Sequence, residues 1–239
     1  MCLYIDRSTR VPNGIGNLTC LEQLSLLGIY DSTINITEEL GQLTELRQLS
    51  IELDEWNDKL LKCLCKLQKM QELHIRVDPG QCSIGGFDAW VAPRHLRVLR
   101  TIHSCWFSTL PAWVNLLLLL DLIGLSIAVR ELHQVDLEIL GRLPALRSLY
   151  LEVDNKNLGI LGGFVVVGGA FPCLVRCYFE QFVWPVVFQH GAMPRLGELW
   201  FLFYLRDVGP GNLPSLRFVR AALLCDGTSK EEVEQARLR

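Results

Sequence analysis

The sequence of 239 residues lacks the short motifs that mark nucleotide binding and the common hydrolytic mechanisms. It contains no Gly-Lys dipeptide, so the phosphate-binding loop G-x-x-x-x-G-K-[ST] is absent. It also contains no G-x-S-x-G nucleophile elbow and no H-E-x-x-H zinc motif. We therefore predict that the chain is not an enzyme and that it uses no cofactor.

Long runs of like charge are absent as well. The net charge is −3, both signs are interspersed, and neither a basic stretch nor an acidic tail stands out. Nucleic-acid-binding proteins usually carry a basic stripe, so we predict no nucleic-acid partner. The N-terminus has no basic segment followed by an apolar one, so no signal peptide is indicated.

The cysteines do not indicate a disulfide framework, because the nine of them are odd in number and irregular in spacing. Cys177 falls at a position where an apolar side chain is expected, and a free cysteine behaves as a small hydrophobe. This usage indicates a reducing compartment, and we predict a cytoplasmic location.

No metal site is indicated either. Cys63 and Cys65 lie close together without a second ligand pair at zinc spacing. His95, His103 and Cys105 form a loose cluster that has no evident fourth ligand. We expect each of these residues to serve packing.

One segment, residues 114–129, imitates a membrane span. Asp121 interrupts it, and it is shorter than the ~20 apolar residues that a helix needs to cross a bilayer. Its leucines also fit the repeat described next, so we predict a core strand and no membrane span.

The pattern L-x-x-L-x-x-L-x-L recurs nine times, with one degenerate copy. Successive copies are 20 to 28 residues apart, which is the range of leucine-rich repeats. In each copy the x-L-x-L segment predicts a short strand whose leucines enter the core. The copies begin at Leu18, Leu43, Leu67, Pro93, Leu119, Leu143, Phe171, Met193 and Leu213.

Stacked repeats of this kind build an α/β solenoid of horseshoe shape. A parallel β-sheet lines its concave face, and irregular loops and short helices cover its convex face. Helical spacing favours helices over 54–67 and 131–140, with Gly141 as a stop signal. Glycines predict long loops over 78–92 and 155–170, and the latter is expected to be a flexible loop around the apolar stretch 164–167.

We assign residues 1–222 to the array, which has about nine repeats plus a partial N-terminal strand. Residues 223–239 form a charged C-terminal tail, in which Thr228 and Glu231 suit the capping box of a short helix. Leu3 and Ile5 are already in phase with the repeats, and nothing polar covers that first coil. Solenoids need capping repeats, so we expect the chain to be a fragment or truncated product of a longer protein.

The residue between the two strand leucines points outward, and these residues are our candidate protein contacts. The second half of the row is aromatic and ends in arginine, which are residue types enriched at binding hot spots. The alternative is that these rings only pack on one another across the sheet. Glu52, Arg76, Glu152 and Glu180 flank the row as a mixed-charge rim. In order, the candidate contacts are Ser25, Ser50, His74, Arg100, Ser126, Tyr150, Tyr178, Trp200 and Arg220.

Several phrases resemble the irregular repeats of plant intracellular nucleotide-binding leucine-rich-repeat immune receptors of the coiled-coil class, as found in cereals. They are Ile15-Gly-Asn-Leu-Thr-Cys-Leu-Glu-Gln-Leu, Leu40-Gly-Gln-Leu-Thr-Glu-Leu-Arg-Gln-Leu, Phe107-Ser-Thr-Leu-Pro-Ala-Trp113 and Leu140-Gly-Arg-Leu-Pro-Ala-Leu. The resemblance covers nearly the whole chain. The phosphate loop of that family's switch domain has no counterpart here.

The resemblance implies a surface that recognises a pathogen effector or a guarded host protein, or that restrains the receptor's own nucleotide-binding domain. Two alternatives stay open. One is a freestanding scaffold or adaptor in intracellular signalling, and the other is the substrate-recruiting subunit of a ubiquitin ligase. An upstream reading frame with a phosphate loop would favour the receptor, whereas an F-box-like segment would favour the ligase.

Overall fold

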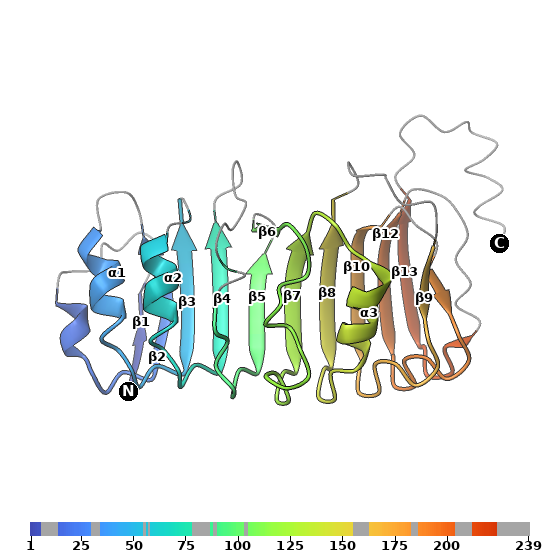
Figure 1. Ribbon diagram of the computed structural model, residues 1–239, viewed down its shortest axis with the longest axis horizontal. Coiled ribbons are helices and arrows are strands. Elements are labelled where there is room, and N and C mark those ends of the chain that lie inside the picture. Colours follow the sequence, from blue (N-terminus) through green and yellow to red (C-terminus); the bar gives the residue numbers. More distant parts are fainter. Residues whose placement is uncertain are drawn as a thin grey trace.

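The structure is a row of parallel strands that stand side by side, with short helices on one side of them (Figure 1). It is a computed structural model that describes residues 1–5, 14–29, 34–54, 56, 58–77, 87, 90–102, 105–154, 163–182, 186–203 and 212–223. A short strand, β6 (Trp106–Phe107), pairs with β7 beside the main row. The main row consists, in order, of β1 (Cys2–Tyr4), β2 (Gln23–Ile29), β3 (Gln48–Leu53), β4 (Glu72–Val77), β5 (Val98–Ile102), β7 (Gly124–Val129), β8 (Ser148–Val153), β10 (Arg176–Phe182), β12 (Glu198–Phe203) and β13 (Phe218–Leu223).

Each coil is joined to the next by a repeated pair of backbone hydrogen bonds at the start of its strand. The carbonyl of Glu22 accepts from the N–H groups of Arg47 and Gln48, at 2.8 and 3.0 Å. In every later coil the residue after the second position of the L-x-x-L-x-x-L-x-L pattern accepts the same pair of bonds through its carbonyl, and the last pair is donated by Arg217 and Phe218. These bonds satisfy the backbone where the chain enters each strand, and they fix the register of neighbouring coils.

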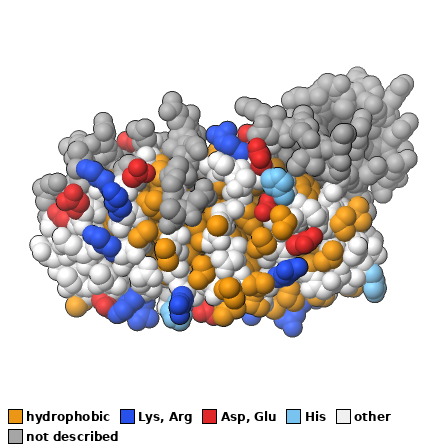
Figure 2. All heavy atoms as spheres, in the orientation of Figure 1, with side chains coloured by type: hydrophobic (Ala, Val, Ile, Leu, Met, Phe, Trp, Pro, Cys, Tyr) orange, Lys and Arg blue, Asp and Glu red, His pale blue; other side chains and the backbone are white. Residues whose placement is uncertain are grey.

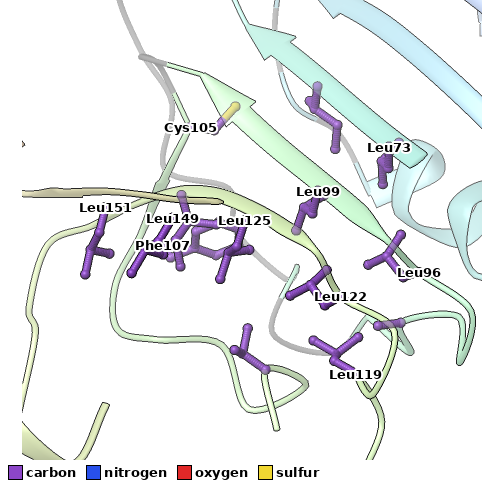
Figure 3. Packing of buried hydrophobic residues seen from close by; sticks show 14 of the residues in the cluster. Leu73, Leu96, Leu99, Cys105, Phe107, Leu119, Leu122, Leu125, Leu149 and Leu151 are labelled. Atoms are coloured by element: carbon purple, nitrogen blue, oxygen red, sulfur yellow. The ribbon is translucent and has the colours of Figure 1, made fainter. Parts of the chain in front are cut away.

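The four leucine positions of the L-x-x-L-x-x-L-x-L pattern, which we call the frame positions, form the core that the repeat predicts. Leu99 pairs with Leu125, and Leu125 pairs with Leu149, in three adjacent strands. All three side chains are buried, and Figure 3 shows them pointing into the same interior. Cys177 continues this line as a buried side chain opposite Leu149. The predicted fold class, a leucine-rich-repeat solenoid with a parallel sheet, is confirmed.

The register of β2 departs from the regular repeat by one residue. Leu26 was expected in the core, but β2 is irregular between Leu24 and Leu27, and Leu27 lies opposite Ile51. Leu27 is fully buried. A bulge adds one residue to a strand and so shifts the side chains that follow it, which the leucine run in this segment conceals in the sequence.

The two ends of the row behave differently. Leu3 pairs with Leu24, so the predicted N-terminal strand is in phase with the repeats. Val219 pairs with Leu199 as expected, but it is 47% exposed and not part of the core. β13 is the last strand of the described sheet, so Val219 packs from one side only. The division at residue 222 stays a prediction, because residues 224–239 lie outside the described part of the chain.

Both predicted helices are present with narrower bounds. α2 (Asp58–Leu64) lies within residues 54–67. α3 (Gln134–Gly141) begins later than predicted and includes Gly141, the predicted stop, as its last residue. They lie on the same side of the sheet in Figure 1, opposite the face that the outward strand residues form. The repeat therefore leaves one face of the sheet open.

The sequence did not predict α1 (Ile34–Leu40) or the short 3₁₀ helix η1 (Ile15–Asn17). Glu39 of α1 joins the two, because its carboxylate accepts hydrogen bonds from the N–H groups of Gly14 and Gly16, at 2.7 and 3.2 Å. An acidic group placed at the N-terminus of a helical turn is favourable. The contact ties one coil to the next on the helical side.

The apolar stretch in 155–170 is not only a loop. Residues Phe164–Val166 form β9, which pairs in parallel with β11 (Val186–Phe188) in a second, two-stranded sheet. The expectation of a flexible loop is wrong for these residues, because their partner lies about 20 residues further along the chain, beyond the range of local patterns. The repeat that begins at Phe171 contains the partner strand β11.

Amide side chains flank the second sheet. Gln134 of α3 donates to the carbonyl of Val165 at 2.8 Å and accepts from its N–H at 2.9 Å. On the other side, Asn212 donates to the carbonyl of Phe188 at 2.7 Å. Neighbouring coils thus satisfy backbone groups that would otherwise lie at open sheet edges.

Aromatic side chains fill the interior between β5 and β7, on the helical side. Trp113 lies 5.8 Å from Phe87, 5.1 Å from Trp90 and 6.3 Å from Phe107, measured between ring centroids. Its indole N–H donates to the carbonyl of Phe87 at 3.0 Å. All four side chains are buried. The Phe-to-Trp phrase at 107–113 is therefore a packing motif.

Residues 114–129 form a turn followed by β7. Leu119 and Leu122 are fully buried at frame positions, whereas Leu117 and Leu120 are 89% and 58% exposed. No helix among the described residues is long and apolar enough to cross a membrane.

Candidate protein-binding surface

The predicted outward residues form one line across the sheet. From Ser50 to Arg220 each is the direct register partner of the next, and Tyr4 of β1 pairs with Ser25 at the other end. The bulge in β2 interrupts the line only between Ser25 and Ser50. None of these side chains is buried. We call this side of the sheet the open face.

Three rings stack along the second half of the line, and we call them the aromatic ladder: Tyr150, Tyr178 and Trp200. The ring centroids of Tyr150 and Tyr178 are 6.3 Å apart, and those of Tyr178 and Trp200 are 5.3 Å apart. Offset pairs at such distances are favourable for aromatic rings. Each ring is partly exposed. The ladder thus packs on itself and still presents apolar area to the solvent.

The ladder ends in a charge and a further ring. The guanidinium carbon of Arg220 lies 4.7 Å from the centre of the Trp200 ring, which is a cation–π contact. Phe218 lies 5.7 Å from Trp200 and is 48% exposed. Sequence reasoning missed Phe218, although its position two residues before Arg220 places it on the same face.

The predicted rim residues also lie on the open face. Arg76 and Glu52 are register partners with 3.5 Å between Nε and Oε1. Glu152 pairs in register with Glu180, and its carboxylate accepts a hydrogen bond of 2.8 Å from the side chain of Gln181. Gln181 has φ 58°, and the ladder of β10 and β12 shifts register beside it. This bulge turns an extra amide toward Glu152.

Exposed charge on the open face is basic. The exposed charged side chains in its described strands are Arg76, Arg100, Arg176 and Arg220. Glu152 is buried at 5% exposure, and the other glutamates of this face are half-buried. A partner that approaches this face therefore meets guanidinium groups before it meets carboxylates.

His74 lies in the polar half of the line, between Ser50 and Arg100. Burial lowers the pKa of His74 from its ordinary value of 6.5, the Arg100 guanidinium lowers it further, and Glu72 opposes both effects. The Nε2 atom of His74 is buried without a hydrogen-bond partner. The folded protein consequently favours neutral His74 at this site.

We expect His74 to make the protein less stable as the pH falls. Below 6.5 the unfolded chain takes up a proton at His74 while the folded chain resists it, so the free energy of unfolding decreases. Urea unfolding between about pH 7.5 and pH 5 should show a smaller loss for His74→Gln than for the unsubstituted protein. His95→Gln is the control, since the His95 side chain is 75% exposed. Equal pH dependence in His74→Gln and the unsubstituted protein would contradict this account.

Two residues of the loose metal-ligand cluster are described, and they lie in different surroundings. His95 is exposed and faces Asp121 at 3.4 Å, whereas Cys105 is buried in the core. His103 lies outside the described residues. Burial raises the pKa of the Cys63 thiol to about 12, which fits a packing role. No group of three or more potential ligands comes together among the residues that the structure describes.

A parallel sheet with one face packed and one face free defines a leucine-rich-repeat scaffold. The family model described as a leucine-rich repeat region matches residues 1–239, and the chain belongs to this family. Disease resistance protein RGA5 of Oryza sativa subsp. japonica is 28% identical over 221 residues, which cover 85% of this chain. The chain spans 19% of that protein's length. The resemblance to repeats of plant immune receptors is thereby confirmed.

A solved structure gives the same fold. The leucine-rich-repeat protein LIC12759 of Leptospira interrogans matches with a TM-score of 0.51 at 18% identity. The match covers 94% of this chain and 60% of the Leptospira chain. At this identity the similarity shows the fold alone.

Proposed function

We propose that this chain is the recognition module of a plant immune receptor and that it acts in the cytoplasm. Its partner is a protein: a pathogen effector, a guarded host protein, or the receptor's own nucleotide-binding domain. The proposal is supported by the similarity to a rice disease resistance protein and by the open sheet face. Solenoids of this class use such extended surfaces for binding.

The observation that carries the proposal is the aromatic ladder with Arg220 at its end. Large partly exposed rings and arginine are the residue types that dominate binding energy at protein interfaces. Here they lie on neighbouring strands in register, so they form one continuous strip. The strip leaves apolar area in contact with water, which a protein partner would cover.

We expect the double substitution Tyr178→Ala and Trp200→Ala to abolish binding of a partner that uses the open face. Loss of two hot-spot side chains weakens binding by at least about 30-fold. The measurement is a two-hybrid screen of a cereal effector and host library with the whole chain, followed by titration of each purified partner. Partners should bind the unsubstituted chain and fail to bind the double variant.

Leu117→Ala is the matched control, because Leu117 is a large apolar side chain that is 89% exposed outside the open face. It should keep every partner that the unsubstituted chain binds. Far-ultraviolet circular dichroism of both variants excludes unfolding as the cause of lost binding. If every partner bound the double variant as tightly as the unsubstituted chain, the ladder would serve packing only.

A further inference from the structure

One position in the repeat has lost its side chain. The residue after the second position of the pattern, whose carbonyl accepts the paired hydrogen bonds of the next coil, carries a side chain in every coil except one. At the eighth coil it is Gly197, between Val175 of the preceding coil and Arg217 of the following one. The full row is Glu22, Arg47, Gln71, Arg97, Ile123, Arg147, Val175, Gly197 and Arg217.

Gly197 lines a depression of about 800 Å³, open to solvent, at the N-terminal ends of β12 and β13. These ends lie along the lower edge of the sheet in Figure 1. Val175, Pro214, Leu216 and Phe218 line it with apolar surface. Val175 and Phe218 are 42% and 48% exposed, so water meets much of this surface.

The charged residues of the depression are Arg195, Arg217 and Glu198. Both arginines are exposed, whereas Glu198 is half-buried. Neither arginine forms an ion pair with any residue that the structure describes. Their guanidinium groups are therefore available to a carboxylate from outside, and guanidinium is well suited to bind one.

The depression is continuous with the open face. Phe218 lines it and also contacts Trp200 of the aromatic ladder, with ring centroids 5.7 Å apart. A protein that covers the ladder would reach the depression at the end of the same strip. In the space-filling view of the opposite, helical side, hydrophobic and charged side chains are interspersed (Figure 2).

We infer that this depression is a side-chain pocket for an acidic segment of the protein partner. A leucine-sized apolar side chain occupies the space above Gly197, and a neighbouring carboxylate pairs with Arg195 or Arg217. The inference rests on the proposed function, because it assumes a protein partner. It adds which part of the partner is held and by what chemistry.

Gly197 offers a precise way to close the pocket. A Cβ atom placed there would lie 3.8 Å from the carbonyl oxygen of Val175, which is an ordinary contact, so a substitution at this position starts without a backbone clash. Gly197→Leu places a branched apolar side chain over the part of the depression that Gly197 lines, where it would block a ligand side chain. Gly197→Ala adds a single methyl group and serves as the matched control.

The test uses three blocked tripeptides as probes: acetyl-Asp-Leu-Asp-amide, its neutral twin acetyl-Asn-Leu-Asn-amide, and its polar twin acetyl-Asp-Ser-Asp-amide. Each is titrated at constant ionic strength into the whole chain, followed by the NMR shifts of the Gly197 and Phe218 amides. We expect the first peptide to shift both amides and to bind at least about 5-fold more tightly than either twin. Gly197→Leu should abolish this binding, and Gly197→Ala should keep it.

The inference is overturned if the first peptide causes no shift of Gly197 up to about 10 mM. It is also overturned if Gly197→Leu binds as the unsubstituted chain does, or if the neutral twin binds equally well. These outcomes do not depend on the aromatic ladder. If substitutions in the aromatic ladder abolish binding of a protein partner that Gly197→Leu still binds, the pocket is refuted and the proposed function stands. If the peptide binds at Gly197 but substitutions in the ladder leave partner binding unchanged, the role of the ladder in the proposed function is refuted and the pocket stands.

Discussion

Replacing Leu149 with alanine should lower the free energy of unfolding by about 3 kcal/mol, within the range of roughly 2 to 5 kcal/mol for buried leucines. Leu149 is fully buried and lies between Leu125 and Cys177 in the middle of the sheet. Its removal takes apolar contacts from three coils at once. Because each coil of a solenoid is stabilised mainly by its neighbours, a cavity here weakens the array at its centre.

The measurement is urea unfolding followed by circular dichroism, with Leu117→Ala as the control. Leu117 is 89% exposed, although it lies in an unbroken run of leucines. Its replacement should change the free energy of unfolding by less than about 0.5 kcal/mol. If Leu149→Ala and Leu117→Ala lowered the free energy of unfolding by similar amounts, the repeat pattern would not determine which leucines are buried.

The contrast between these two leucines shows how much of the fold the sequence encodes locally. The repeat spacing predicts that Leu119, Leu122 and Leu125 are core residues, and all three are buried. The spacing also predicts that the other leucines of the run 116–120 lie outside the core positions, and Leu117 and Leu120 are indeed exposed. Composition alone would have grouped all of them in one apolar segment. Stacking of the coils is therefore predictable, because one short pattern determines both strand position and register.

Features that depend on contacts between distant segments were not predictable. β9 becomes a strand only because β11 pairs with it and Gln134 bonds to its backbone. The bulge in β2 brings Leu27 opposite Ile51, and the run of leucines in the sequence gives no sign of this shift. In both cases the decisive partner lies in another coil.

Besides Gln181, two core residues adopt a backbone conformation that is rare for non-glycine residues. Phe171 and Met193 have positive φ values of 55° and 46°, which non-glycine residues rarely adopt. Each side chain is buried in the core, and the N–H group of Met193 donates to the carbonyl of Ala170 at 2.9 Å. Packing and hydrogen bonding together hold these residues in place. A pattern of residue types gives no sign of this.

The candidate site shows the same division. The line of outward residues follows from strand alternation, so its members were predictable from the repeat. The contact of Phe218 with Trp200 and the depression above Gly197 were not, because both depend on which side chains the adjacent coils supply. The period of the repeat identifies which residues form the open face, whereas the shape of that surface depends on the individual side chains.

Replacing Trp113 with alanine should lower the free energy of unfolding by about 4 kcal/mol, since truncating a large buried aromatic side chain to alanine typically costs about 3 to 5 kcal/mol. Trp113 contacts Phe87, Trp90 and Phe107, which fill a stretch of the helical side between α2 and α3. Among the described residues no helix lies between those two. The rings therefore supply the cover over β5 and β7 that helices supply elsewhere.

Trp113→Phe separates packing from hydrogen bonding. It keeps an aromatic ring but removes the indole N–H that donates to the carbonyl of Phe87 at 3.0 Å. An acceptor left unsatisfied in the interior costs roughly 1 to 3 kcal/mol, so this variant should lie between the alanine variant and the unsubstituted protein in urea unfolding. If phenylalanine were as destabilising as alanine, the hydrogen bond and the shape of the indole would account for the whole effect. If Trp113→Ala lowered the free energy of unfolding by less than about 1 kcal/mol, the aromatic cluster would not be what covers these strands. Truncation of a large buried aromatic side chain typically costs about 3 to 5 kcal/mol.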